Sequence, residues 1–279
     1  MVSTQSLFFP VLLAAMLVAV GAFSAFQPKA QIRKQRSRNH ESNSGGTDRA
    51  NKLHFKSRVP KPLVRANLHK TVVLECEAAG SPPPTIHWLF NGSRIIQGVD
   101  NSIIDEEASY ESTVTANKHI SMLKLSSTIS RLYVDCVTKA DEGHYTCVAD
   151  NPTQRVVTNT KLKIHRNVVG VEDGCLAKKD HEGIPARVYM WTVNRLEVEG
   201  AYVQLFCRAF GLPRPEITWL DRDDNLITRN SNDYRLLPNG DLLVKAITFD
   251  AKMGVYKCVA RNEFGQDKQE TFLYPAGGF

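Results

Sequence analysis

Apolar and polar residues alternate with a period of two in several short segments of the chain. The segments are TVVLECEA, TIHWLF and SRLYV in the first half, and AYVQLFCRA, EITWL and GDLLVK in the second. Successive side chains of a β-strand point to opposite faces, so this period predicts strands with one buried face. No segment has a convincing helical period, and clusters of Gly, Pro, Asn and Asp separate the segments. The pattern therefore predicts an all-β sandwich fold.

The second half of the chain repeats the first. Aligning Cys76 with Cys207 places CEAAGSPPPTIHWLFNG over CRAFGLPRPEITWLDRD, with Gly, Pro, Pro, Ile and Trp in register. Farther along, GHYTCVADN matches GVYKCVARN. In both copies a Trp follows the first Cys by twelve residues, and a Tyr precedes the second Cys by two. A duplication of this length indicates two domains of the same fold.

This spacing of Cys, Trp, Tyr and Cys resembles that of the immunoglobulin fold. The resemblance implies two tandem immunoglobulin-like, I-set-like β-sandwiches, at residues 53–166 and 185–275. It also implies that one disulfide bridges the two sheets of each domain, that the Trp packs on it, and that the Tyr hydroxyl binds the backbone before the second Cys. These roles fall on Cys76, Cys147, Trp88 and Tyr145 in the first domain and on Cys207, Cys258, Trp219 and Tyr256 in the second.

The two copies depart from each other at two places. In the second domain Lys252 stands where an Asp is usual, six residues before the Cys, so we expect a rearranged turn there. The first domain has 71 residues between its cysteines against 51 in the second. Its excess lies around QGVDNSIIDEEASYESTVTANKH and forms either extra edge strands or a long loop.

The N-terminal residues predict an extracellular destination. The first 26 residues contain no charged side chain and carry an apolar run that ends in small residues, so residues 1–24 read as a secretory signal peptide. A membrane anchor is the alternative, but the apolar core is short for a span. The polar, basic stretch 25–52 cannot bury enough apolar surface to fold, and residues 167–184 form the linker between the domains. We expect a secreted protein without a membrane span.

The positive charge is concentrated near the N-terminus. Residues 27–61 hold ten Lys or Arg and two acidic residues, a net charge of +8. Residues 62–279 therefore have a net charge of −2, since the net charge of the whole chain is +6. This basic tail is either a solvated linker or a contact for a glycosaminoglycan. An extracellular address argues against nucleic acid as its partner.

Six cysteines in an oxidising compartment indicate three disulfides. After the two framework pairs, Cys136 and Cys175 remain. Cys136 falls in the turn between the fifth and sixth immunoglobulin strands and is expected to face outward. Cys175 follows Ile164 by eleven residues, which span at most about 36 Å, so it can reach the turn. A bridge between them would fix the linker against the first domain; free thiols or an intermolecular bridge are the alternatives.

The whole layout resembles a family of secreted two-immunoglobulin proteins that includes the insect neural/ectodermal development factors and the nematode zwei-Ig proteins. The resemblance rests on GSPPPTIHWLFNG, SRLYVDCV and GDLLVKAIT and covers about residues 53 to 275. It implies binding of an insulin-like peptide hormone, which keeps the hormone from its receptor. The alternative is a secreted neural adhesion or guidance protein that acts through protein contacts.

One tryptophan, Trp191, is left over by the two cores. It lies with Tyr189 on one side of the first strand of the second domain. Such a pair is either buried under the linker or open to a partner. As candidate hormone contacts we name Val169, Val171, Tyr189 and Trp191.

Catalysis and metal binding find no support in the sequence. The histidines lack zinc-protease spacing, and no nucleophile elbow or phosphate loop occurs, so we expect no enzymatic activity, cofactor or metal. The segment DRDDN at 221–225 begins like a calcium loop but lacks its Gly and its final Glu, and a polar turn explains it better. Asn91, in NGS, is a candidate glycosylation site, whereas Pro152 blocks the second sequon.

Overall fold

A computed structural model of the 279-residue chain describes residues 52–97, 125–165, 175, 183–228 and 231–277. The predicted signal peptide, nearly all of the basic tail and the excess segment of the first domain lie outside these residues. Within them the secondary structure is β-strand apart from two short helical turns, η1 (Lys139–Asp141) and α5 (Phe249–Lys252). The all-β prediction is confirmed.

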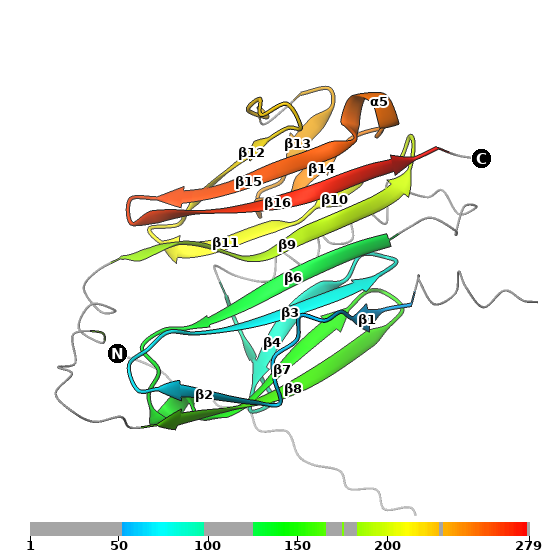
Figure 1. Cartoon of the computed structure of the whole chain (residues 1–279). Coiled ribbons are helices and arrows are strands. Elements are labelled where there is room, and N and C mark those ends of the chain that lie inside the picture. The colour runs from blue at the N-terminus through cyan, green and yellow to red at the C-terminus, as the bar shows by residue number, and fades with distance from the viewer. Residues whose placement is uncertain (1–51, 98–124, 166–174, 176–182, 229–230, 278–279) are drawn as a thin grey trace, which may run out of the picture. The chain divides into compact units, whose positions relative to one another are not determined.

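The first domain is a sandwich of two sheets (Figure 1). One contains β1 (His54–Phe55), β3 (Val72–Gly80) and β6 (Leu125–Val134), in that order. The other has the order β2 (Leu63–Asn67), β8 (Arg155–His165), β7 (Gly143–Asp150), β4 (Thr85–Phe90), β5 (Ser93–Ile95). Burial alternates along β8, where Leu162 and Ile164 are buried while Lys161 and Lys163 are exposed. The apolar positions of the two sheets thus face a shared core.

The second domain repeats this plan. One sheet has the order β10 (Val203–Leu205), β14 (Leu242–Val244), β13 (Tyr234–Leu236). The other has the order β9 (Ile184–Val198), β16 (Gly265–Ala276), β15 (Gly254–Asn262), β12 (Glu216–Leu220), and β11 (Cys207–Leu212) pairs with β9. Strand β9 therefore pairs with two strands of its own domain. Its first half runs antiparallel to β11, and its second half runs parallel to β16.

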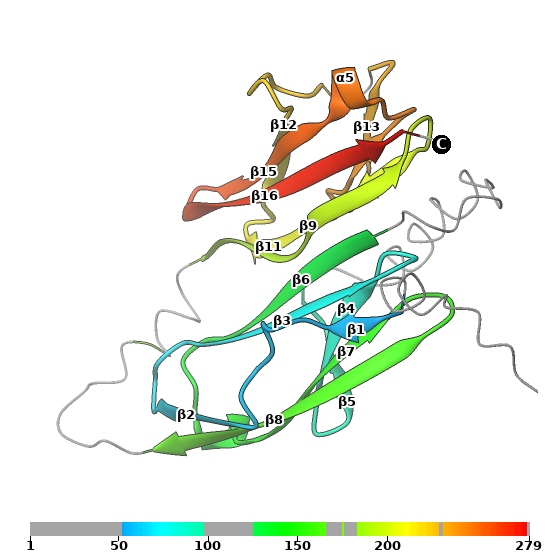
Figure 2. The same ribbon diagram turned by 45° about the vertical axis from the view of Figure 1, so that its right-hand side comes forward.

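Strand β9 also continues the sheet of the first domain. It pairs antiparallel with β6, from Leu125 opposite Leu196 to Ser130 opposite Met190. The continuous path is β1-β3-β6-β9-β16-β15-β12, and Figures 1 and 2 show β6 and β9 side by side. Because β6 has β3 on one edge and β9 on the other, that strand is not an open edge.

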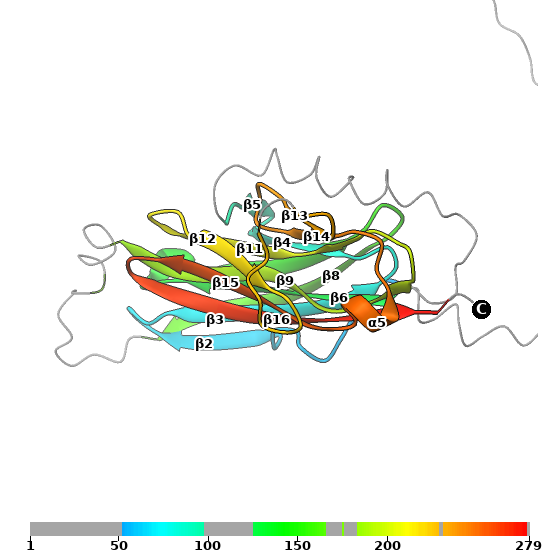
Figure 3. The same cartoon turned by 90° about the horizontal axis from the view of Figure 1, so that it is seen from above.

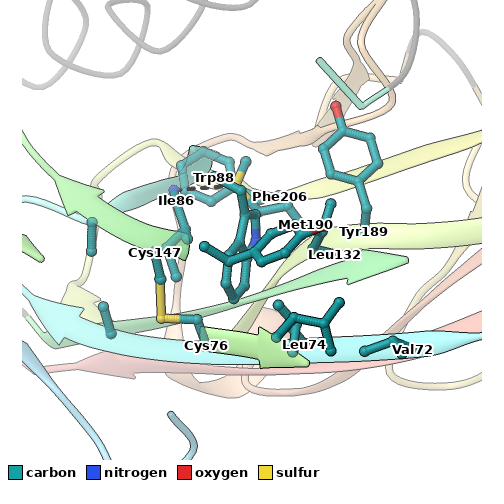
Figure 4. Close-up of a cluster of buried hydrophobic side chains, with 14 of the residues drawn as sticks. Val72, Leu74, Cys76, Ile86, Trp88, Leu132, Cys147, Tyr189, Met190 and Phe206 are labelled. Atoms are coloured by element: carbon teal, nitrogen blue, oxygen red, sulfur yellow. Dashed lines mark hydrogen bonds between the residues drawn. A yellow bond between two sulfur atoms is a disulfide. The ribbon is translucent and has the colours of Figure 1, made fainter. Parts of the chain in front are cut away.

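Each core is built on a disulfide and a tryptophan. In the first domain Trp88 lies directly opposite Cys147, which is bonded to Cys76 with an S–S distance of 2.05 Å (Figure 4). In the second, Trp219 lies opposite Cys258, which is bonded to Cys207. Both indole rings are only 1% exposed. Their N–H groups donate to protein oxygens, so each buried ring is satisfied as well as packed.

A tyrosine fixes the turn before the second cysteine in both domains. Tyr145 Oη donates to Asp141 O at 3.0 Å, and Tyr256 Oη donates to Lys252 O at 3.1 Å. The expected rearrangement at Lys252 therefore leaves the tyrosine bond in place. The buried Lys252 ammonium instead donates to Asp233 Oδ1 at 2.6 Å, so a cation bonded to a neighbouring loop occupies this corner.

Candidate functional site

The seam between the domains, by which we mean the paired strands β6 and β9, exchanges buried side chains in both directions. Met190 and Tyr189 of the second domain pack in the core of the first, together with Phe206 (Figure 4). Ile86 N of the first domain lies 3.4 Å from Met190 Sδ and donates to it. In return Ile129 of β6 packs in the core of the second domain. Neither core is complete without the other domain.

The aromatic pair that we predicted as hormone contacts lies within this seam. Trp191 is 4% exposed, and the Arg131 guanidinium lies 4.6 Å from its ring centre. Tyr189 is 9% exposed, and burial raises the pKa of its hydroxyl. Side chains so covered cannot contact a hormone, so this burial contradicts the predicted role of Tyr189 and Trp191. The other two candidates, Val169 and Val171, lie outside the described residues.

A disulfide and an ion pair support the seam at its far end. Cys136 follows β6 and is bonded to Cys175, with 5.8 Å between the Cα atoms. We expected the Cys136 side chain to face outward, and this prediction is wrong, since the residue is only 8% exposed. Its φ of 53° lies in the left-handed region. Next to it, Asp135 Oδ2 lies 2.7 Å from Arg187 Nη1 of the second domain. The turn after β6 is thus tied to the linker covalently and to β9 by charge.

Exposed apolar side chains gather on the outer side of the shared sheet. We call this surface the seam face. Its exposed members are Leu125, Val255, Phe272 and Tyr274 of the sheet and Phe249 of α5, and the half-buried Leu196 of β9 lies among them. Directly opposed residues of paired strands point to the same side of a sheet. Leu125 lies opposite Leu196, which lies opposite Tyr274, and Phe272 lies opposite Val255. Because β6, β9, β16 and β15 are neighbours in one sheet, the seam face runs from the first domain across β9 into the second. Figure 3 shows these strands from above.

Three aromatic rings form the centre of the seam face. Phe249 and Tyr274 are 41% and 39% exposed, with ring centres 5.8 Å apart in an edge-to-face arrangement. Phe272 is 40% exposed and lies 6.4 Å from Tyr274. Two exposed glutamates lie next to these residues: Glu199, whose carboxylate accepts a hydrogen bond from Phe249 N, and Glu270, two residues before Phe272 on β16. An apolar centre with a polar rim is the arrangement found at protein interfaces.

Comparison with known proteins places these features in a family. The immunoglobulin domain model matches residues 56–151 and the immunoglobulin I-set domain model matches residues 192–274. The chain is 33% identical over 206 residues to the zwei Ig domain protein zig-4 of Caenorhabditis elegans, with 74% of each chain covered. It is 30% identical over 224 residues to the neural/ectodermal development factor IMP-L2 of Drosophila melanogaster, covering 80% of this chain and 76% of that one. The chain belongs to this family of two-immunoglobulin proteins. The crystal structure of IMP-L2 superimposes with a TM-score of 0.59 at 25% identity, covering 82% and 98% of the two chains.

Members of this two-immunoglobulin family are binding proteins rather than enzymes. In the part of the chain that the structure describes, no group of three His, Cys, Asp or Glu side chains is arranged to hold a metal ion. None of the helical segments described is long and apolar enough to cross a membrane. The residues of the apparent calcium loop form a turn instead, in which Asp221 Oδ1 accepts from the backbone N–H groups of Asp223 and Asn225, both at 2.9 Å.

The candidate glycosylation residue Asn91 lies in the exposed turn between β4 and β5. Its φ of 48° and the φ of 88° at Gly92 are both positive, as a two-residue hairpin turn requires. Asn91 Oδ1 accepts a hydrogen bond from His144 N at 2.9 Å. This bond uses the amide oxygen and not the amide nitrogen, which is the atom that a glycan would modify, and Asn91 remains a proposed glycosylation site.

The seam face is the part of the site that sequence reasoning missed. Its signal is the TFLY segment, in which Phe272 and Tyr274 alternate with the buried Thr271 and Leu273. In a strand with one buried face, the outward positions are ordinarily polar. Two aromatic residues at outward positions of one strand are therefore a signal, visible in the sequence, of an exposed apolar surface.

Proposed function

We propose that the protein is secreted, binds an insulin-like peptide hormone on the seam face and so keeps the hormone from its receptor. The proposal is supported by similarity to IMP-L2 along most of both chains, since the resemblance of this layout to the insect factors implies hormone binding. The single observation that supports this surface as the binding site is the exposed aromatic cluster formed by Phe272 and Tyr274 of the shared sheet and Phe249 of α5.

The physical basis is the low entropic cost of binding to a rigid aromatic surface. Tyr and Phe have two side-chain torsions, and residues on paired strands keep their backbone fixed when a partner docks. A small hormone with an apolar surface removes the rings from water at little cost in ordering. Large aromatic residues at the centre of such a patch carry most of the binding free energy.

The test compares three aromatic residues of the hairpin formed by β15 and β16. Phe272→Ala and Tyr274→Ala should each weaken binding of an insulin-like peptide by about 30-fold, the equivalent of about 2 kcal/mol for a central aromatic residue. Phe264→Ala is the matched control, because Phe264 is 47% exposed at the turn between β15 and β16, away from the seam. Isothermal titration with a panel of insulin-like peptides measures the affinities, and thermal unfolding confirms that each variant is folded.

The outcomes separate the possible roles. Loss of affinity in Phe272→Ala and Tyr274→Ala, with Phe264→Ala unchanged, supports hormone binding at the seam face. Undiminished hormone affinity in both seam variants would show that the hormone docks elsewhere. Absence of heat with every peptide at micromolar protein would instead favour the adhesion or guidance role, which cell-aggregation measurements on the same variants would then test.

A further inference from the structure

Basic side chains gather on the outer side of the other sheet of the first domain, away from the seam face. Arg65 on β2 lies directly opposite Lys163 on β8 in the parallel pair, and Lys161 of β8 lies directly opposite His144 of β7. His165 continues the row along β8. All five side chains are exposed. We call Arg65, His144, Lys161, Lys163 and His165 the cationic face.

The three permanent cations of this face form no ion pair with another residue that the structure describes. Within the described ranges, no carboxylate lies within 4.0 Å of Arg65, Lys161 or Lys163. Glu142 interacts electrostatically with Lys163. Its carboxylate is already bonded, however, to Ile164 N at 2.6 Å and to the ammonium of Lys139 at 2.9 Å.

In the other sheet of the same domain, basic side chains are paired with acidic ones. There Arg131 Nε lies 2.7 Å from Glu75 Oε2, and Lys56 Nζ lies 3.3 Å from Glu77 Oε1. Like charges placed directly opposite each other in a sheet are destabilising, as Arg65 and Lys163 are. The repulsion between Arg65 and Lys163 therefore weakens the fold slightly, which makes this cationic face a candidate for binding an external anion.

We infer that the cationic face binds a sulfated polysaccharide chain of the glycosaminoglycan class. Alternate residues of β8 are about 6.6 Å apart, and neighbouring strands are separated by about 4.8 Å, so the positive charges form a flat array. Such an array matches a polymer with repeated anions better than a single phosphate. Arg and Lys form charge-assisted hydrogen bonds with sulfate oxygens as they do with phosphate oxygens.

Two observations favour a sulfated sugar over a nucleic acid. Proteins that bind single-stranded nucleic acid stack its bases on aromatic side chains. The exposed aromatic residues of the described chain, Phe249, Phe264, Phe272 and Tyr274, all lie in the second domain. The three disulfides also fit an oxidising extracellular compartment, where the abundant polyanions are sulfated glycans.

The experiment compares two triple variants of the full chain that remove the same charge. The first carries Arg65→Gln, Lys161→Gln and Lys163→Gln. The control carries Arg214→Gln, Arg261→Gln and Lys268→Gln, three exposed cations of the second domain. Because both keep the basic N-terminal tail, any difference between them reports the position of the charges rather than their number. The probes are heparin, chemically desulfated heparin and double-stranded DNA of similar length.

We expect the first triple variant to bind heparin at least about tenfold more weakly than the natural chain. The slope of log K for heparin against log salt concentration should become shallower by about two to three units, since each lost ionic contact removes about one unit. The control variant should change heparin affinity less than twofold, and desulfated heparin should bind neither protein well. Equal losses in the two variants would overturn the inference, because binding would then follow net charge or the tail. So would DNA that binds as tightly as heparin through the same three residues. Unchanged hormone affinity in the first variant separates this result from the proposed function.

Discussion

Replacing Ile129 by Ala should destabilise the second domain, although the residue belongs to a strand of the first. Its side chain is 1% exposed and packs in the core that surrounds Trp219. It lies directly opposite Trp191 across the seam. Removing three carbons from so buried a site costs the transfer free energy and leaves a cavity, and such truncations cost about 2 to 5 kcal/mol. We expect about 3 kcal/mol, because the paired strands on both sides restrict collapse around the cavity.

Hydrogen exchange locates this loss. The side chains of Leu242 and Val244 in β14 (Leu242–Val244) pack in the second core. In Ile129→Ala, the opening free energy measured by hydrogen exchange at the backbone amides of β14 should fall by about 3 kcal/mol. The control is Leu74→Ala, a truncation in the first core at a residue that is 2% exposed. If Leu74→Ala lowers protection in β14 as well, the two domains unfold as one unit; if it does not, Ile129 acts by direct packing. Unchanged protection of β14 in Ile129→Ala would refute the reasoning, since the side chain could then not be part of the second core.

Two further predictions concern the first domain. Replacing both Cys136 and Cys175 by Ser should lower the free energy of unfolding, measured by urea denaturation, by about 4 kcal/mol. This magnitude is the chain-entropy estimate for a loop of 39 residues. Non-reducing peptide mapping of the natural chain should recover the two cysteines linked to each other. Burial, followed by the charge of Asp141, raises the pKa of Tyr145 from 10.0 to about 12, so its neutral hydroxyl stabilises the fold fully below pH 10. That contribution, at most about 2.7 kcal/mol, should disappear between pH 10 and pH 12, and the unfolding free energy of Tyr145→Phe should lack this alkaline step.

The sandwiches were predictable because their determinants are local. The alternation in TVVLECEA and AYVQLFCRA fixes which side of a strand is buried, whatever the strand pairs with. The duplicated spacing of Cys, Trp and Tyr then places the same turn and the same core contact in both halves. These relations involve residues of one domain only, so the sequence contains enough information to state them.

The seam could not be predicted from the same information. Pairing between β6 and β9 joins residues that are 60 to 71 positions apart in sequence, from Ser130 with Met190 to Leu125 with Leu196. No local period says which strand will cover the edge of β6. The sequence consequently leaves open whether Trp191 is buried or open to a partner, and in the structure its ring packs inside the molecule. One signal was present: β9 is 15 residues long, far longer than the other strands of the second domain except β16. A strand that keeps apolar residues over this length needs covering on both sides.

The pairing of β6 with β9 has a consequence for how binding can be arranged. The first domain is a sandwich, so the outer sides of its two sheets point away from each other. The seam face begins at Leu125 on one of these sheets, and the cationic face with Arg65 and Lys163 lies on the other. A hormone on the first surface and a polysaccharide on the second would therefore not exclude one another. A chain that does both would hold a hormone on a fixed extracellular polymer while keeping it from its receptor, because the two surfaces lie on opposite outer sides of the first domain.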